Sequence, residues 1–160
     1  MQFTQSMSYP GTVDEVVAMY LTPDYLERRF GRFVVEGSTT VSVEGQRASY
    51  AGTVRPELIP AAAARFVKSD LRVTFTEEWT TNEAGATSRT SVAVDGAPVS
   101  VEATSTLTPR DAGCAREVSG NLSVRVPLLG GRIEKEAVAR VGRLTENERA
   151  SAAQWLEEHH

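Results

Sequence analysis

The chain has 160 residues, of which 17 are basic and 21 acidic, and its formal net charge is −4. This length suits a single domain over residues 1–160 that buries about 70% of the surface exposed by its unfolded form. The charges are spread along the chain and form no basic stripe, so we expect no nucleic-acid partner.

The first part of the chain is predicted to form one strand and two short helices. Residues 3–9 alternate between longer side chains and short polar ones, which is typical of a half-buried strand. Thr12, followed by Glu15 three residues later, has the spacing of a capping box and predicts a helix over 13–20. Thr22-Pro23 starts a second short helix by the same logic, and that helix should end near Gly31.

From residue 33 the apolar pattern changes to a period of two, which predicts six further strands. We expect them over 33–43, 47–55, 71–80, 87–95, 99–107 and 114–126. The segments between them contain glycine, proline, asparagine or aspartate, as hairpin turns do. One connection differs, because four alanines after Pro60 predict a helical turn over 61–66.

The chain ends in one long predicted helix, from about Leu129 to Glu158. Pro127 ends the last strand, and Gly130-Gly131 should free the backbone to turn into this helix. Most of one helix face is apolar, with these residues three or four apart: Ile133, Ala137, Val141, Leu144, Glu148, Ala152 and Trp155. A helix about 45 Å long cannot fill the whole concave face of a twisted sheet, so we expect a pocket between the two.

This order of elements predicts an α+β fold. A curved antiparallel sheet of about seven strands should wrap around the long C-terminal helix, with two short helices between the first and second strands.

Three passages resemble a known family. They are Leu58-Ile59-Pro60 running through Arg65-Phe66-Val67 to Glu78-Trp79, then residues 126–134, and finally Gln154-Trp155-Leu156. Together with the element order, they resemble an actinobacterial branch of the START-like (SRPBCC, helix-grip) superfamily, a branch known as a domain of unknown function. The resemblance implies a cavity between sheet and helix, which in many relatives accepts lipids, sterols or polyketides. It carries over no catalytic residue.

The residues that common catalytic and metal sites need are scarce. The only histidines, His159 and His160, end the chain and are either native or part of a purification tag, so they carry no site hypothesis. The single cysteine, Cys114, excludes an internal disulfide and a cysteine-based metal cage, and suits a reducing compartment. We therefore expect no cofactor and no metal. No apolar run approaches the roughly 20 residues of a membrane span, and we expect a cytoplasmic protein.

Glu77 is the most unusual side chain, because alternation places it beside Phe75 and Trp79 on the inner side of its strand. A carboxylate there could act as an acid or base, with a pKa raised by desolvation. The favoured interpretation is less specific: a bulge between Glu77 and Glu78, or a wet position at the rim. Arg28, Arg29 and Arg32 could likewise attract an anionic head group, although a solvated face is the simpler interpretation.

We expect binding or carriage of a small hydrophobic molecule, a lipid or polyketide, without chemistry. The residues predicted to line its cavity are Tyr50, Val54, Val73, Phe75, Glu77, Trp79, Leu122, Ile133, Ala137 and Val141. One alternative is an enzyme of the cyclase or dehydratase kind that uses a cavity carboxylate. Another is an interaction module with a filled pocket, and a cavity far below about 300 Å³ would favour it. The protein should be a monomer or a homodimer.

Overall fold

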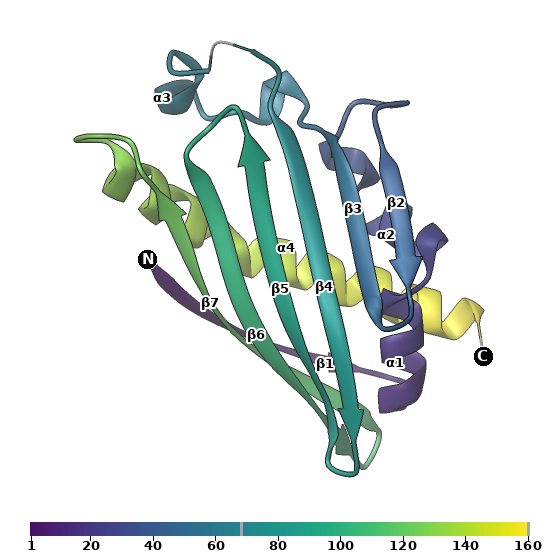
Figure 1. Ribbon diagram of the computed structural model, residues 1–160. Coiled ribbons are helices and arrows are strands. Elements are labelled where there is room, and N and C mark those ends of the chain that lie inside the picture. Colours follow the sequence, from purple (N-terminus) through teal and green to yellow (C-terminus); the bar gives the residue numbers. More distant parts are fainter. Residues whose placement is uncertain (68, 160) are drawn as a thin grey trace.

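The computed structural model describes residues 1–67 and 69–159, so His160 lies outside the described residues. Seven antiparallel strands form one sheet, and a long helix crosses its inner side (Figure 1). The elements in chain order are β1 (Gln2–Tyr9), α1 (Val13–Tyr20), α2 (Pro23–Phe30), η1 (Gly31–Phe33), β2 (Thr40–Glu44), β3 (Arg47–Thr53), η2 (Pro56–Leu58), α3 (Ala61–Ala64), β4 (Arg72–Asn82), β5 (Gly85–Asp95), β6 (Val99–Arg110), β7 (Gly113–Val124) and α4 (Gly130–Glu158). The predicted fold class is confirmed.

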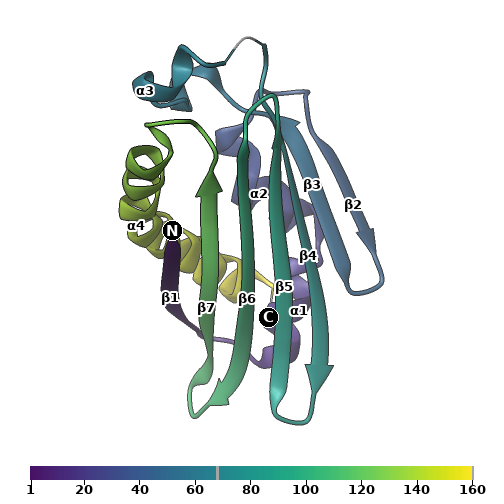
Figure 2. The same cartoon turned by 60° about the vertical axis from the view of Figure 1, so that its left-hand side comes forward.

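The strand order across the sheet is β1-β7-β6-β5-β4-β3-β2. Strands β2 to β7 are therefore a meander of hairpins, and β1 pairs with the last strand. The helices α1, α2 and α4 all lie on the same side of the sheet (Figure 2). Side chains on that side form the core, and those on the other side face outward.

The first helix begins as its sequence predicts. The Thr12 hydroxyl accepts a hydrogen bond from the Glu15 backbone N–H at 3.1 Å, and the Glu15 carboxylate accepts one from the Thr12 backbone N–H at 3.1 Å. The second helix also forms where predicted, over Pro23–Phe30 with proline in its first turn, but Thr22 does not cap it with its side chain. The Thr22 hydroxyl donates instead to the Ala18 carbonyl at 2.7 Å.

The predicted strand over 33–43 is much shorter in the structure. A 3₁₀ turn occupies Gly31–Phe33, Val34 forms one isolated bridge with Val54, and regular pairing begins only at Thr40. Gly37 has a φ of 81°, which turns the chain where the alternation of β-prone residues suggested a straight run. Conversely, the β4–β5 and β6–β7 hairpins are paired up to two-residue turns, and all four strands extend beyond their predicted limits at these turns.

The core is densest at the end of the sheet beneath α1. Tyr20 is fully buried, stacks on Trp79 with 5.6 Å between ring centroids, and meets Tyr25 edge-on at the same separation. Tyr25 in turn contacts Trp155 near the end of α4. Cys114 is also buried there.

Helix α4 is firmly packed only at its two ends. Its buried residues are Gly130, Ile133, Ala152, Trp155 and Leu156. Between these ends Val141 is half-buried, and Leu144, predicted to face the core, is 45% exposed. The middle of α4 therefore does not seal against the sheet.

Candidate functional site: an apolar cavity and a buried ion cluster

An apolar cavity of about 240 Å³ lies near the beginning of α4, at the end of the sheet away from α1. Its walls come from the segment around η2 and α3, from strands β5 to β7 and their connections, and from α4. The lining residues are Val54, Leu58, Ile59, Pro60, Ala63, Phe66, Val67, Leu71, Val94, Ala97, Pro98, Val99, Leu122, Val124, Val126, Ile133 and Ala137. Each of these side chains is apolar, so the cavity offers contacts through shape and dispersion alone.

Four of the ten predicted site residues line this cavity: Val54, Leu122, Ile133 and Ala137. Tyr50, Phe75 and Val73 lie in a separate packed cluster around Leu26. Val141 lies one turn beyond Ala137 on α4. Ligand binding by these residues stays a prediction.

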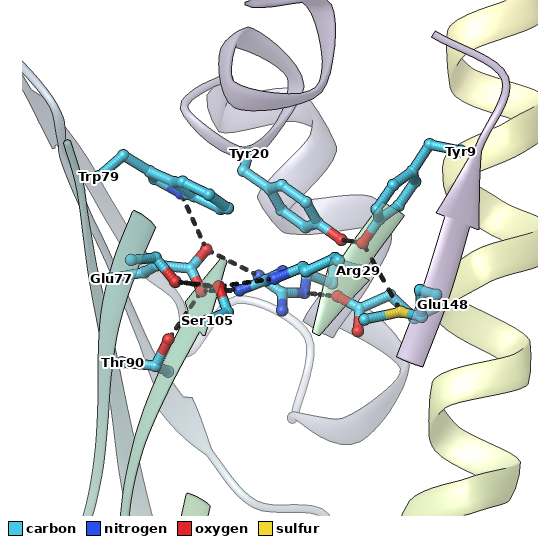
Figure 3. Close-up of polar contacts among 11 residues, drawn as sticks. Tyr9, Tyr20, Arg29, Glu77, Trp79, Thr90, Ser105 and Glu148 are labelled. Atoms are coloured by element: carbon cyan, nitrogen blue, oxygen red, sulfur yellow. Dashed lines mark hydrogen bonds and ion pairs between the residues drawn. The ribbon is translucent and has the colours of Figure 1, made fainter. Parts of the chain in front are cut away.

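Of the two remaining predicted residues, Glu77 belongs to a buried ion cluster, which we define as Arg29, Glu77, Arg116 and Glu148. Trp79 borders this cluster and donates a hydrogen bond to Glu77. Glu77 Oε2 lies 2.8 Å from Arg116 Nη2, and Glu77 Oε1 lies 3.6 Å from Arg29 Nη1. Arg29 Nε also pairs with Glu148 Oε1. Figure 3 shows Arg29 between the two carboxylates, which come from β4 and α4. Two positive and two negative charges make the cluster neutral.

The favoured prediction for Glu77, a bulge or a wet rim position, is wrong. The pairing of β4 is regular there, with Glu77 opposite Ala48 on one side and Thr90 on the other. Its residue exposure is 1%. The carboxylate stays inside because Arg116, Arg29, Thr90 and Trp79 surround it with opposite charge and hydrogen-bond donors.

The pKa of Glu77 is lowered, contrary to the rise that the acid–base alternative required. Burial by itself raises the pKa of this carboxyl, but the charges of Arg116 and then Arg29, with hydrogen bonds from Thr90 and Arg116, outweigh it. Burial likewise opposes the charge on each guanidinium, yet the pKa of Arg29 is raised by Glu148 and Glu77, and that of Arg116 chiefly by Glu77. Glu77, Arg29 and Arg116 are therefore held in their ionised forms.

Hydroxyls and aromatic rings complete the surroundings of Arg116. Its Nε donates to Ser105 Oγ at 3.0 Å, and the Ser105 and Ser88 hydroxyls lie 2.6 Å apart. The guanidinium carbon lies 4.9 Å from the ring centroids of both Tyr20 and Trp79.

The sequence predictions missed Arg116, although a signal was present. It has the same parity in its strand as Leu122, which was predicted to line the cavity. Charged residues are almost always exposed unless they are paired with an opposite charge. An inward Arg116 could therefore have been predicted only by pairing it with an inward Glu77 on another strand.

The ion cluster leaves Glu77 little capacity for catalysis. Oε1 accepts from Trp79 Nε1 at 3.2 Å and faces Arg29, while Oε2 accepts from Thr90 and Arg116 at 2.8 Å each. An acid must hold a proton and a base must have a free lone pair. This geometry is that of a structural ion pair.

The three arginines after α1 have different environments. Arg29 points inward with only 12% of its side chain exposed. Arg28 pairs with Glu158 at 3.1 Å, and Arg32 is exposed with its guanidinium over the Phe33 ring. The predicted solvated face is thus wrong for Arg29.

A wider hollow of about 680 Å³ lies along β4 to β7 and β1. Its lining is mostly threonine, serine, glutamate and arginine from the outer side of the sheet, such as Thr80, Arg89 and Thr104. Such a polar, shallow surface suits a ligand less well than the smaller apolar cavity does.

Within residues 1–67 and 69–159, no three His, Cys, Asp or Glu side chains gather in a way that could hold a metal ion. None of the described helices is long and apolar enough to cross a membrane.

Comparison with known proteins identifies similar chains along nearly the whole length. The family model described as "Protein of unknown function (DUF2505)" matches residues 4–156. Uncharacterized proteins of Mycobacterium tuberculosis (strain H37Rv) and Mycobacterium bovis are each 26% identical to this chain, covering 96% of it and 95% of the relative.

Solved structures share the fold at low sequence identity. Norcoclaurine synthase from Thalictrum flavum, in complex with dopamine and hydroxybenzaldehyde, has a TM-score of 0.62 at 13% identity and covers 100% of this chain and 88% of its own. A conserved protein from Geobacillus kaustophilus has a TM-score of 0.61 at 20% identity, with 100% and 97% coverage. Ara h 8.0201 has a TM-score of 0.61 at 11% identity, with 99% and 98% coverage. These matches confirm the helix-grip fold inferred from the sequence resemblance.

Proposed function

The chain belongs to the DUF2505 family, and we propose that it binds a small apolar molecule in the cavity between the sheet and the first half of α4. The observation that carries this proposal is the composition of the cavity wall, in which all the lining side chains are apolar. Ligand pockets in proteins are predominantly apolar and concave. Such a cavity can bind a molecule whose buried part carries no charge.

The partly exposed inner face of the sheet supports the same proposal. Val92, Val101, Val118 and Leu122 all lie on the inner side of the sheet, yet each is only half-buried. Removing apolar surface from water contributes about 25 cal/mol per Å². An apolar ligand would gain this free energy where the middle of α4 does not cover the sheet.

The cavity volume favours a compact ligand. At about 240 Å³ it lies just below the range of about 300–1,000 Å³ that is usual for ligand sites. A protein of the same fold, norcoclaurine synthase, was solved with dopamine and hydroxybenzaldehyde. Molecules of that size, or one short alkyl chain, suit this cavity better than a whole membrane lipid.

The two alternative functions have less support. Glu77, the carboxylate that an enzymatic function would require, is ionised and held by Arg116 and Arg29. A module with a filled interior would lack the cavity. Because the cavity wall has no reactive side chain, binding or carriage of a ligand without a chemical reaction agrees best with it.

A matched pair of variants on α4 tests the proposal. Ala137 lines the cavity, whereas Ala139 is exposed on the same helix. We expect Ala137→Phe to fill the cavity and abolish the rise in melting temperature that decanol produces, and Ala139→Phe to preserve it. At a ligand concentration about 100-fold above Kd the stabilisation is about 2.7 kcal/mol, which is a rise of several degrees.

Native mass spectrometry of protein purified from its source organism, followed by organic extraction, identifies a retained ligand. The proposal would be contradicted if the purified protein had the mass of the ligand-free chain and if neither decanol nor a panel of neutral lipids and polyketides raised its melting temperature.

A further inference from the structure

A second hollow, of about 170 Å³, lies between α2 and α4. We call it the arginine hollow, because Arg28, Arg29 and Arg32 contribute to its wall. Tyr25 and Ser151 also line it, and so does Leu144. The function proposed above makes no use of it.

The Tyr25 hydroxyl beside this hollow lacks a hydrogen-bond partner among the described residues. Tyr25 is completely buried, and its Oη makes no hydrogen bond of acceptable geometry with any described residue. The Ser151 hydroxyl lies beside it and partly offsets the rise of its pKa, but the two hydroxyls lack hydrogen-bond geometry. Burial raises the pKa of Tyr25 well above its ordinary value, so the phenol keeps its proton and remains a donor. Buried polar groups in native proteins are normally paired, and this one points to an absent acceptor.

The charge of the wall favours an anionic acceptor. Three arginines and one glutamate, Glu148, line the arginine hollow, and Glu148 is already paired with Arg29. Arg28 is partly engaged by Glu158. Arg32 is exposed, and the described part of the chain provides it with no carboxylate partner. Its guanidinium is therefore available to a carboxylate or phosphate.

One face of α4 connects the arginine hollow with the apolar cavity. Ala137 lines the cavity, and Leu144, two turns later, lines the hollow, so the two sites are about 11 Å apart along the helix. Val141 lies between them and is half-buried, and Leu144 is 45% exposed. An apolar strip thus runs from one site to the other.

We propose that the arginine hollow binds the anionic head group of an amphipathic ligand whose apolar part occupies the cavity. This rests on the proposed function for the apolar half of the ligand. Tyr25 Oη and the Arg32 guanidinium donate hydrogen bonds to the head group, and the Val141–Leu144 strip contacts the chain. A medium-chain carboxylate is the simplest molecule with these properties.

Calorimetric titration of the full chain with decanoate, decanol and acetate tests the inference. We expect decanoate to bind at least tenfold more tightly than decanol at low salt, and this preference to shrink as salt is added. Acetate should bind far more weakly than decanoate because it lacks the apolar part.

Two substitutions should remove the preference for charge. A hydrogen bond to a charged group is stronger than one between neutral groups, so Tyr25→Phe and Arg32→Gln should each weaken decanoate binding by about tenfold or more. Neither should change the binding of decanol. Tyr25→Phe keeps the ring, and Arg32 is exposed, so both variants should fold, as circular dichroism can verify. Arg140→Gln, at an exposed position elsewhere on α4, is the control and should change nothing.

The outcomes separate this inference from the proposed function. If decanoate and decanol bind with equal affinity, or if both variants bind decanoate as the parent does, the head-group site is overturned. The proposal that the apolar cavity binds a ligand is then unaffected. Acetate that binds as tightly as decanoate would overturn the link between the two sites. Binding of neither decanoate nor decanol would overturn both proposals.

Discussion

Glu77 contributes to folding through a carboxylate that is almost completely shielded from water. It is 1% exposed and contacts Arg116 and Arg29, and the cluster they form with Glu148 is neutral. Neutrality is essential, because an unpaired buried charge is far more costly than the pair itself. Each member of the ion cluster is therefore sensitive to the loss of any other.

Replacing Glu77 with glutamine should be strongly destabilising. The substitution keeps the shape but leaves two buried guanidinium groups with one carboxylate, and breaking such a pair costs about 3–5 kcal/mol. Glu78 is the matched control, since it is the next residue, faces outward and has 60% of its side chain exposed in a 3.7 Å pair with Arg47. Chemical denaturation should show a change within about 0.5 kcal/mol for Glu78→Gln.

The acid dependence of stability gives the same experiment a second readout. The lowered pKa of Glu77 means that its ionised form stabilises the folded protein above the ordinary carboxyl pKa of about 4.3. This contribution disappears as the pH falls through the lowered pKa of the folded state. Glu77→Gln should therefore reduce the loss of stability on acidification. Equal stability of Glu77→Gln and the parent at neutral pH would show that the ion cluster is not structural.

Sequence reasoning at this scale identified the orientation of Glu77 but not its environment. Alternation placed the residue inward, since a strand has a strict period of two. Its charged partners, Arg29 and Arg116, come from α2 and β7, which are distant from β4 in sequence, and no local pattern records their distances. For that reason the rise in pKa that the acid–base alternative required was the wrong direction.

At the level of secondary structure, the start of α4 depends on one glycine. A Cβ built on Gly130 would lie 2.3 Å from the Val124 carbonyl oxygen, whereas Gly131 has nothing within 4 Å of that position. The sequence predicted two glycines that free the backbone. Instead, Leu128 takes the left-handed conformation, with a φ of 68°, and Gly130 permits close contact between helix and sheet.

Alanine substitutions at these two neighbouring positions should have different effects. Gly130→Ala forces the backbone apart and should cost about 1–3 kcal/mol, the usual range for overpacking. Gly131→Ala should be neutral or stabilise by up to about 1 kcal/mol, because alanine favours helix. Urea denaturation of both variants measures the difference. Identical effects would mean that the contact with Val124 imposes no restriction.

For the whole molecule, three regions follow one another along the inner side of the sheet. A closed aromatic core lies beneath α1, the ion cluster follows, and the apolar cavity occupies the opposite end. Element order and alternation were sufficient to predict the sheet, the long helix and a leftover space between them. The position of that space was not predictable, because it depends on how the segment around η2 and α3 packs over the sheet end.

Ligand binding should therefore affect the two ends of the molecule differently. Hydrogen exchange reports local opening, which a bound ligand suppresses where it makes contact. We expect decanol to slow exchange in residues 58–66 and 133–137, which contribute to the cavity wall, and to leave α1 unchanged. Uniform protection across the chain would instead indicate global stabilisation without a defined binding site.

The burial of Cys114 has a practical consequence. It is the only cysteine of the chain, it is 2% exposed, and burial, with a smaller effect of Glu15, raises the pKa of its thiol to about 11. Thiolates, not thiols, attack alkylating reagents, so this sulfur is unreactive at neutral pH. A cysteine introduced beside the cavity could be tagged with a fluorophore or a spin label in the native background, with no competing thiol to remove.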